Sequence, residues 1–261
     1  MGMSCKILIC ILAFVSFKYK KLMNIAIAQI KPVKGDIPAN IEKHITFINL
    51  ATVLKADSIF FPELSLTGYE PELSKNLAVD INDNRFDEFQ ELSDLKSIAI
   101  GVGVPTVSKT GIRISMIIFQ SKQPRTIYSK QQLHEDEFPY FESGNQQILI
   151  NQKIAPAICY ESLQINHAEK AVDQGAQIYI ASVAKSQNGI NKTYEHYPKI
   201  AKKYKMTVLM SNCVGECDNF VSAGFSSVWN KEGKLITHFN NEQEGIIIFN
   251  TETEKVTKQT I

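Results

Sequence analysis

Three short segments of the chain each place a reactive side chain directly after an apolar run. The reactive residues are Glu63, Lys130 and Cys159. A carboxylate can take a proton from a thiol, a thiolate can attack a carbonyl carbon, and an ammonium can hold the oxyanion that forms. A free thiol is only partly ionised near neutral pH, so it needs a nearby base or cation. These residue types predict hydrolysis or acyl transfer through a cysteine acyl-enzyme.

Each segment taken alone also has a structural interpretation. Glu63 can be an acid solvated in a turn, the run after Lys130 can be a polar surface loop, and Cys159 can be an inert buried cysteine. The strand-like run Ala155–Ile158 leads into Cys159 and then into a helical segment. That order is similar to the strand–turn–helix elbow that exposes a nucleophile, which favours the reactive interpretation.

Strand and helix signals alternate along residues 23–261, and no Gly/Ser-rich linker, Pro-rich linker or internal repeat interrupts them. Helices are predicted near 41–55, 86–95, 164–173 and 193–205, and strands near 24–30, 58–61, 98–104, 112–119, 125–129, 147–150, 155–158, 177–183, 207–212, 225–229, 234–237 and 245–249. This alternation predicts one α/β domain in which helices cover sheet faces. Side chains just past strand ends, such as Glu63, then stand where α/β proteins place their sites.

The ordered motifs resemble the nitrilase superfamily of carbon–nitrogen hydrolases. They are Phe61-Pro62-Glu63-Leu64, then Lys130 followed by Glu137, then Cys159-Tyr160-Glu161, and later Asn212-Cys213-Val214-Gly215 and Ser222-Ala223-Gly224-Phe225-Ser226. The resemblance extends from Met23 to about Phe249. It implies a four-layer α-β-β-α sandwich (α/β, or α+β) that assembles into a homodimer or larger homo-oligomer.

The resemblance also implies a role for each site residue. Cys159 is the expected nucleophile, Glu63 the base, and Lys130 the cation that holds the oxyanion. Glu137 is the expected second glutamate, which orients the lysine and the substrate nitrogen. Tyr160 follows the nucleophile, and its backbone N–H is expected to help hold the oxyanion.

Other positions depart from the superfamily pattern. An arginine often stands four residues after the nucleophile, where this chain has Leu163. The strand that follows often ends in Asn-Trp, where this chain has Ser182-Val183-Ala184. These departures lie on the substrate side of the expected pocket. The resemblance therefore carries over the chemistry but no particular substrate, notably none whose carboxylate an arginine holds.

The expected activity is hydrolysis of a small linear amide or carbamoyl compound with release of ammonia. Alternatives are nitrile hydrolysis or acyl transfer within the same superfamily, and a catalytically silent binding protein that keeps the fold. The complete set of acid, cation and thiol argues against the silent alternative, because packing alone does not require these groups at strand ends. No step requires an organic cofactor or a metal, and the histidines lack metal-ligand spacing.

The composition narrows the partners and the cellular setting. Lysine and arginine total 28 against 27 acids, a net charge of +1, so we expect a small-molecule substrate, no nucleic acid and no stable membrane association. The 5 cysteines have irregular spacing, which favours a reduced, cytoplasmic setting over a disulfide framework. Cys213 and Cys217 are interpreted as buried, inert residues.

Residues 1–22 differ from the rest of the chain. The apolar run Ile7–Phe17 is followed by Lys18, Lys20 and Lys21. It is shorter than the roughly 20 residues that span a bilayer, and its positive charge lies mainly on the wrong side for a signal peptide. We interpret residues 1–22 as a leader outside the 23–261 domain, most simply from a start codon assigned too early; a signal, an anchor or a folded element are the alternatives.

Overall fold

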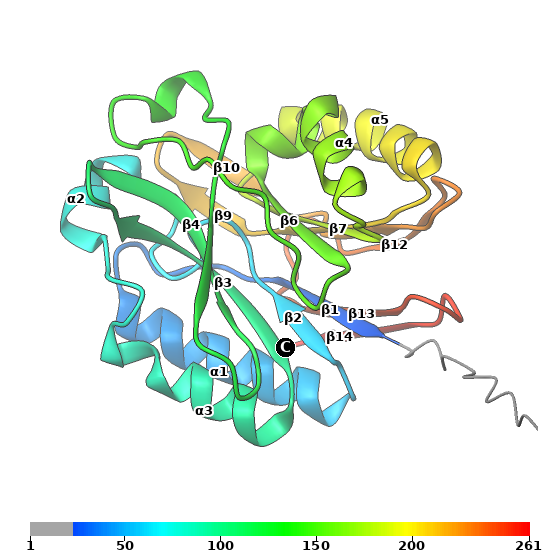
Figure 1. The fold of residues 1–261 in the computed structure, drawn as a ribbon, viewed down its shortest axis with the longest axis horizontal. Coiled ribbons are helices and arrows are strands. Elements are labelled where there is room, and N and C mark those ends of the chain that lie inside the picture. The colour runs from blue at the N-terminus through cyan, green and yellow to red at the C-terminus, as the bar shows by residue number, and fades with distance from the viewer. Residues whose placement is uncertain (1–22) are drawn as a thin grey trace, which may run out of the picture.

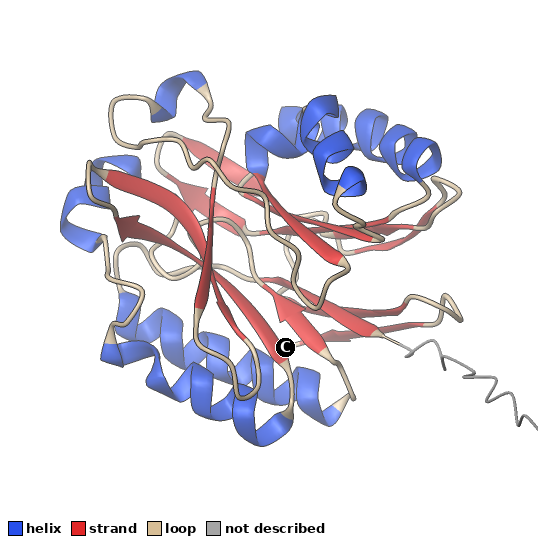
Figure 2. Cartoon of the chain, in the orientation of Figure 1, coloured by secondary structure: helices blue, strands red, loops and turns tan. Residues whose placement is uncertain are grey.

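The computed structural model describes residues 23–261, so the predicted leader lies outside the described residues. Within this range two large sheets face each other, with helices on both outer faces (Figures 1 and 2). The first sheet has the order β14 (Val256–Thr260), β13 (Gly245–Asn250), β1 (Asn24–Gln29), β2 (Ser58–Phe60), β3 (Ala99–Val107), β4 (Ile112–Phe119), β5 (Thr126–Ser129). The second has the order β12 (Leu235–His238), β11 (Ser227–Trp229), β8 (Thr207–Asn212), β7 (Ile178–Val183), β6 (Ile154–Ile158).

Helices and a hairpin complete the described domain. The helices are α1 (Ile37–Val53), α2 (Ser74–Leu77), α3 (Asp87–Lys96), α4 (Ile165–Asp173) and α5 (Gln187–Tyr204), with short 3-10 turns η1 (Pro71–Leu73), η2 (Asn84–Phe86), η3 (Glu135–Glu137) and η4 (Cys159–Leu163). Strands β9 (Val214–Cys217) and β10 (Phe220–Ala223) pair as a separate antiparallel hairpin.

Three hydrophobic cores separate the four layers. One core joins α1 and α3 to the outer face of the first sheet and includes Phe47 and Phe89. The central core, which includes Phe60 and Leu209, fills the space between the two sheets. The third core joins α4 and α5 to the second sheet and contains Tyr197. The predicted α-β-β-α sandwich is therefore confirmed, because each sheet buries both of its faces.

The strand directions bring the chain's reactive segments to one end of the sandwich. Strands β1, β2 and β3 run parallel, as do β6, β7 and β8. Strand β5 has the direction of β3, since β4 is antiparallel to both. The hydroxyl of Ser211, near the end of β8, donates to the carbonyl of Ala28 at 2.6 Å and to that of Phe60 at 3.2 Å. This contact ties the C-terminal ends of strands from the two sheets together.

Some predicted elements differ from the observed ones. The strand predicted at 147–150 is wrong: only Ile150 forms an isolated bridge, with Ile154, and no neighbouring strand pairs with the rest of the segment. Helix α5 begins at Gln187, well before the predicted start, because its polar first turn has no apolar periodicity. Strands β9, β10 and β14 were not predicted, since β9 and β10 are only four residues long and β14 is mostly polar, so none of them gives an alternating pattern.

Candidate active site

The cysteine predicted as nucleophile lies on a sharp turn at the end of β6. Cys159 has a φ of 45°, a left-handed conformation that a non-glycine residue adopts at a cost of roughly 1–3 kcal/mol. Its thiol donates to the carbonyl of Ala184 at 3.7 Å. The chain then turns through η4 before α4 begins, so the predicted strand–turn–helix elbow is present.

Glu63 lies in the turn that follows β2. Glu63 is 2% exposed, and the next residue, Leu64, has a φ of 49°. Neighbouring β3 holds this turn at Gly103, whose carbonyl accepts from Leu66 N at 2.9 Å and whose N–H donates to the Ser65 hydroxyl at 3.1 Å. The position of the Glu63 backbone is thus fixed by hydrogen bonds to the sheet rather than by a flexible loop.

Lys130 follows β5 and is completely buried. Its backbone N–H donates to Ile114 O at 2.9 Å, and its carbonyl accepts from Gly144 N at 2.6 Å. Its ammonium donates to Glu63 Oε1 at 2.8 Å and to Glu137 Oε1 at 2.5 Å. An ammonium carries three N–H donors, so one donor is left after these two bonds.

Glu137, in η3, is held as firmly as the lysine it contacts. Its Oε1 also accepts from the Tyr69 hydroxyl at 3.0 Å, and its Oε2 accepts from the backbone N–H of His134 at 2.7 Å. Tyr69, six residues after Glu63, was not given a role from the sequence. The structure therefore brings the side chains of Glu63, Lys130 and Glu137 into contact.

The group is electrostatically strained, because two carboxylates share one ammonium in a buried place. Burial raises the pKa of Glu63, the Lys130 ammonium opposes this rise, and the Glu137 carboxylate adds to it. Burial alone would lower the pKa of Lys130, but the two carboxylates raise it above its ordinary value. Burial also raises the pKa of the Cys159 thiol to about 11, with a further rise from Glu63, while Lys185 and Lys130 act in the opposite direction.

Glu63 retains one oxygen that the protein does not use. Its Oε2 is buried and has no hydrogen-bond partner of normal geometry among residues 23–261. The Cys159 thiol is nevertheless close enough for each group to affect the pKa of the other. A base with a free oxygen beside a protonated thiol can accept the thiol proton when the sulfur attacks an electrophile.

A third buried glutamate, Glu161, joins the lysine loop to the cysteine turn. Glu161 Oε1 accepts from Ile158 N at 2.7 Å and from the Tyr128 hydroxyl at 2.6 Å, while its Oε2 accepts from Gln131 N at 2.6 Å and from Gln132 N at 3.2 Å. Burial raises the pKa of Glu161 to about 7, and these hydrogen bonds partly oppose the rise. The sequence showed Glu161 only as part of a motif, so its bridging position was missed.

The thiol opens onto a cavity of about 400 Å³. The lining includes Cys159, Glu137 and Tyr160, together with His134, whose side chain is exposed and whose ring packs edge-on against that of Tyr160, with 5.3 Å between the ring centroids. Lys185, which the sequence analysis did not single out, also lines this cavity. Like Glu63 and Cys159 it stands just past the end of a parallel strand, here β7, so the same positional argument points to it.

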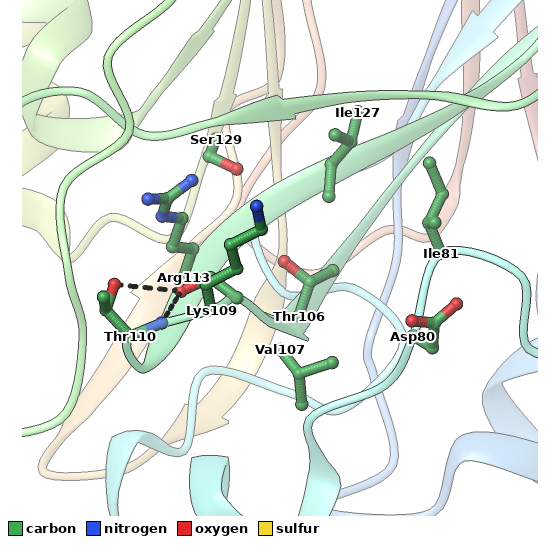
Figure 3. A pocket seen from close by; sticks show the side chains of 10 residues that line it. Asp80, Ile81, Thr106, Val107, Lys109, Thr110, Arg113, Ile127 and Ser129 are labelled. Atoms are coloured by element: carbon green, nitrogen blue, oxygen red, sulfur yellow. Dashed lines mark hydrogen bonds between the residues drawn. The ribbon is translucent and has the colours of Figure 1, made fainter.

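Another cavity, of about 500 Å³, lies beside the turn between β3 and β4 (Figure 3). Asp80, Lys109, Thr110 and Arg113 line it, but it contains no thiol and none of the candidate site residues. Residues 23–261 contain no group of three or more His, Cys, Asp or Glu side chains arranged to hold a metal ion. In the same range, no helix has the length and apolar character needed to cross a membrane.

Comparisons with known proteins identify relatives of this chain. The family model described as carbon-nitrogen hydrolase matches residues 24–259. The glutamine-dependent NAD(+) synthetase of Acinetobacter baylyi is 26% identical over 229 residues, which cover 82% of this chain and 41% of that protein. The enzyme of the same name from Synechocystis sp. is 28% identical over 247 residues, covering 82% of this chain and 44% of that protein. This chain thus spans less than half the length of these curated relatives.

Solved structures with a similar fold include amidases. An amidase from Nesterenkonia sp. has a TM-score of 0.78 at 20% identity, covering 87% of this chain and 89% of that chain. A variant of the amidase from Nesterenkonia sp. AN1, with the acetamide moiety of fluoroacetamide added at the active-site cysteine, has a TM-score of 0.78 at 19% identity, covering 87% and 90%. At these identities the likeness establishes the fold alone.

Proposed function

Because the chain belongs to the carbon–nitrogen hydrolase family, we propose that it hydrolyses a small linear amide or carbamoyl compound through a cysteine acyl-enzyme and releases ammonia. The observation that carries this proposal is the meeting of one thiol, two carboxylates and one ammonium at a single cavity. Cys159 and Glu137 line that cavity, and the buried ammonium of Lys130 joins Glu137 to Glu63.

The first half of the reaction forms the acyl-enzyme. Glu63 takes the proton of the Cys159 thiol as the sulfur attacks the carbonyl carbon, since the raised pKa of the thiol means that no standing thiolate is available. The remaining N–H of Lys130 and the backbone N–H of Tyr160 hold the oxyanion. When the C–N bond breaks, protonated Glu63 returns the proton to the leaving nitrogen, and ammonia departs from a thioester.

The second half regenerates the enzyme with water. Glu63 removes a proton from a water molecule that attacks the thioester carbon, and the oxyanion occupies the same donors. Collapse of this intermediate breaks the C–S bond, and the sulfur recovers its proton from Glu63. The net reaction consumes one amide and one water and yields one carboxylic acid and one ammonia. Glu137 keeps Lys130 in place through both halves.

The main experiment measures ammonia release from a panel of amides, ureas, carbamoyl amines and nitriles. The panel includes butyramide, which is bound by a variant of the amidase from Nesterenkonia sp. AN1, and glutamine, because the curated relatives are named as glutamine-dependent. Wild type should release ammonia from at least one amide, and a folded Cys159→Ala variant should not. Near-wild-type turnover by folded Cys159→Ala would refute the mechanism.

A second experiment tests the nucleophile without knowledge of the substrate. The protein is treated with fluoroacetamide, the reagent whose acetamide moiety is found on the cysteine of the structural neighbour, and the adduct is located by peptide mass spectrometry. We expect labelling of Cys159 that Glu63→Gln slows. Cys217→Ala is the matched control, since Cys217 is buried outside the cavity. In this variant Cys159 should be labelled at the wild-type rate. Absence of any adduct at Cys159 would favour the silent binding protein.

The same panel separates the alternatives within the family. A nitrile turned over faster than its matching amide would make the protein a nitrile hydrolase. Release of free acid that is negligible in water alone, with product formed only when an acceptor such as hydroxylamine is added, would indicate acyl transfer. Assembly into a homodimer or larger homo-oligomer and a cytoplasmic location remain parts of this proposal, which size-exclusion chromatography with light scattering and cell fractionation can test.

A further inference from the structure

Lys185 is a buried cation that the proposed reaction does not use. It is only 5% exposed, yet it lines the cavity that contains the Cys159 thiol. No carboxylate of residues 23–261 forms an ion pair with it, and its ammonium donates no hydrogen bond to any of these residues. Burial of a charged group without a partner is energetically unfavourable. A bound anion from outside the protein would therefore stabilise the Lys185 ammonium.

The backbone of Lys185 is anchored on both sides. Its N–H donates to Asn212 Oδ1 at 2.9 Å, and its carbonyl accepts from Asn212 Nδ2 at 3.3 Å and from Ala223 N at 2.8 Å. The Ser222 hydroxyl donates to the same carbonyl at 3.3 Å. The residue is therefore held by the end of β8 and by β10, and its side chain starts from a rigid base, as a ligand-binding side chain requires.

The aliphatic stem of Lys185 lies along the first turn of α5. A Cβ atom on Gly189 would stand 3.1 Å from the Cβ and 3.3 Å from the Cγ of Lys185. A glycine in this helical turn is unfavourable by roughly 1 kcal/mol relative to alanine. The missing side chain leaves the space that the lysine stem occupies.

The beginning of α5 adds a second attraction for an anion. Ser186, at the N-cap, makes no side-chain capping bond, and the first backbone bond of the helix is that from Ile190 N to Ser186 O. The N–H groups of the first turn are thus free, and the positive end of the helix dipole lies there. Ser186 and Gly189 both line the cavity, next to Lys185, so two independent features favour negative charge at the same wall.

The carboxylates of the cavity are already paired. Glu137 is bound by Lys130 and Tyr69, and Asp136 contacts the His134 ring at 2.6 Å. Leu163, at the position where the superfamily often has an arginine, contributes only apolar surface. Of the two lysines that line the cavity, Lys192 is exposed and Lys185 is buried, so the wall at Lys185 is where a negative group of a ligand would find a buried, unpaired cation.

We propose that Lys185 and the first turn of α5 form an anion subsite that binds a carboxylate of the substrate, so that the enzyme prefers linear amides with a carboxylate at the end away from the scissile bond. This inference rests on the proposed function, because it assigns a substrate class to the same cavity. Lys192, exposed at the rim of the cavity, extends the positive potential outward and assists entry.

The test compares two amides of equal length, butyramide and succinamate. Succinamate has a carboxylate where butyramide has its terminal methyl group. We expect wild type to have the higher kcat/KM for succinamate. Lys185→Met should lower the ratio of the two kcat/KM values roughly 10- to 100-fold, the range of one hydrogen bond between charged groups. Lys185→Arg should retain part of the preference. Lys199→Met, an exposed lysine of α5 outside the cavity, should keep the wild-type ratio.

Gly189→Ala provides a milder perturbation of the same subsite. The added Cβ pushes the lysine stem by a few tenths of an ångström, while alanine favours the helix. We expect the preference for succinamate to fall although the melting temperature does not. This combination distinguishes ligand positioning from a loss of fold.

Two outcomes would overturn the subsite. If folded Lys185→Met loses activity on both amides in the same proportion, Lys185 acts through the Cys159 thiol rather than on the substrate. If wild type hydrolyses butyramide but prefers it over succinamate, the subsite is wrong and the proposed function stands.

Binding measurements separate a failure of the subsite from a failure of the proposed function. Succinamate and butyramide are titrated calorimetrically into folded Cys159→Ala and into Cys159→Ala/Lys185→Met. Binding of succinamate that depends on Lys185, together with no hydrolysis by wild type, would support the subsite and reject the proposed hydrolysis. Failure of succinamate to bind Cys159→Ala would overturn the subsite.

Discussion

The substitution Gly103→Ala tests whether the sheet positions the base. Gly103 lies in β3 beside the turn that carries Glu63. A Cβ atom there would stand 2.4 Å from Pro62 O, 2.5 Å from Leu64 N and 3.0 Å from Ser65 N. These atoms belong to the backbone on both sides of Glu63, so they cannot avoid the new methyl group by a change of rotamer. The turn must move away from β3.

The size of the effect follows from the contact distances. Ordinary van der Waals contact begins near 3.4 Å, so the Pro62–Leu64 backbone must shift by about 1 Å. A displacement of about 1 Å in a catalytic group can reduce the rate about 100-fold. Overpacking of this kind destabilises a fold by roughly 1–3 kcal/mol, which corresponds to a decrease in Tm of roughly 2–12 °C for a domain of this size. We therefore expect a folded protein with about 100-fold lower kcat/KM.

Gly101→Ala is the matched control, because Gly101 lies two residues away in the same strand. Its Cβ would stand 2.6 Å from Phe60 Cδ1 and 2.8 Å from Met116 Sδ, so it disturbs core side chains instead of the Glu63 backbone. Both variants are assayed on the best amide of the panel, with Tm measured by circular dichroism. Gly101→Ala should lose a similar amount of stability but little activity. Equal loss of activity in the two variants, or wild-type activity in folded Gly103→Ala, would refute the positioning argument.

Other predictions follow from the buried charges. Lys130→Met leaves two buried carboxylates without their cation. We therefore expect the free energy of unfolding to fall by about 3–5 kcal/mol and kcat to fall by at least about 100-fold. Unchanged stability in urea titrations would contradict this expectation. Burial raises the pKa of Glu63, and this group must be ionised to act as a base, so kcat/KM should rise with pH through an apparent pKa above the ordinary 4.5. A pH–rate profile with its acid limb at or below that value would argue against Glu63. Glu161→Ala leaves three backbone N–H groups without their acceptor, which should lower the free energy of unfolding by about 2–5 kcal/mol and slow turnover. Denaturant unfolding at neutral pH measures this loss of stability, and a loss smaller than this range would contradict the prediction.

Local sequence determined the elements and the identities of the reactive residues. Apolar residues spaced as in a strand or a helix predicted most of the strands and helices. This works because the spacing of apolar residues within a short segment depends on which faces of the element are buried. The same reasoning placed Glu63, Lys130 and Cys159 just past strand ends. It failed at 147–150, where an apolar segment has no neighbouring strand to pair with, and at β14, whose polar residues are held by the edge of β13.

Tertiary structure alone decided how these residues meet. The sharing of one ammonium by Glu63 and Glu137, and the bridge that Glu161 makes between the lysine loop and the cysteine turn, depend on the register of two sheets and on loops that cross between them. The sequence places Lys185 just past a predicted strand, but only the packing of β7, β8, β10 and α5 makes it a buried cation without a partner. A periodic pattern records which side of an element is buried, but not which distant side chain will lie across from it. Distances and unpaired charges are therefore properties of the assembled sandwich.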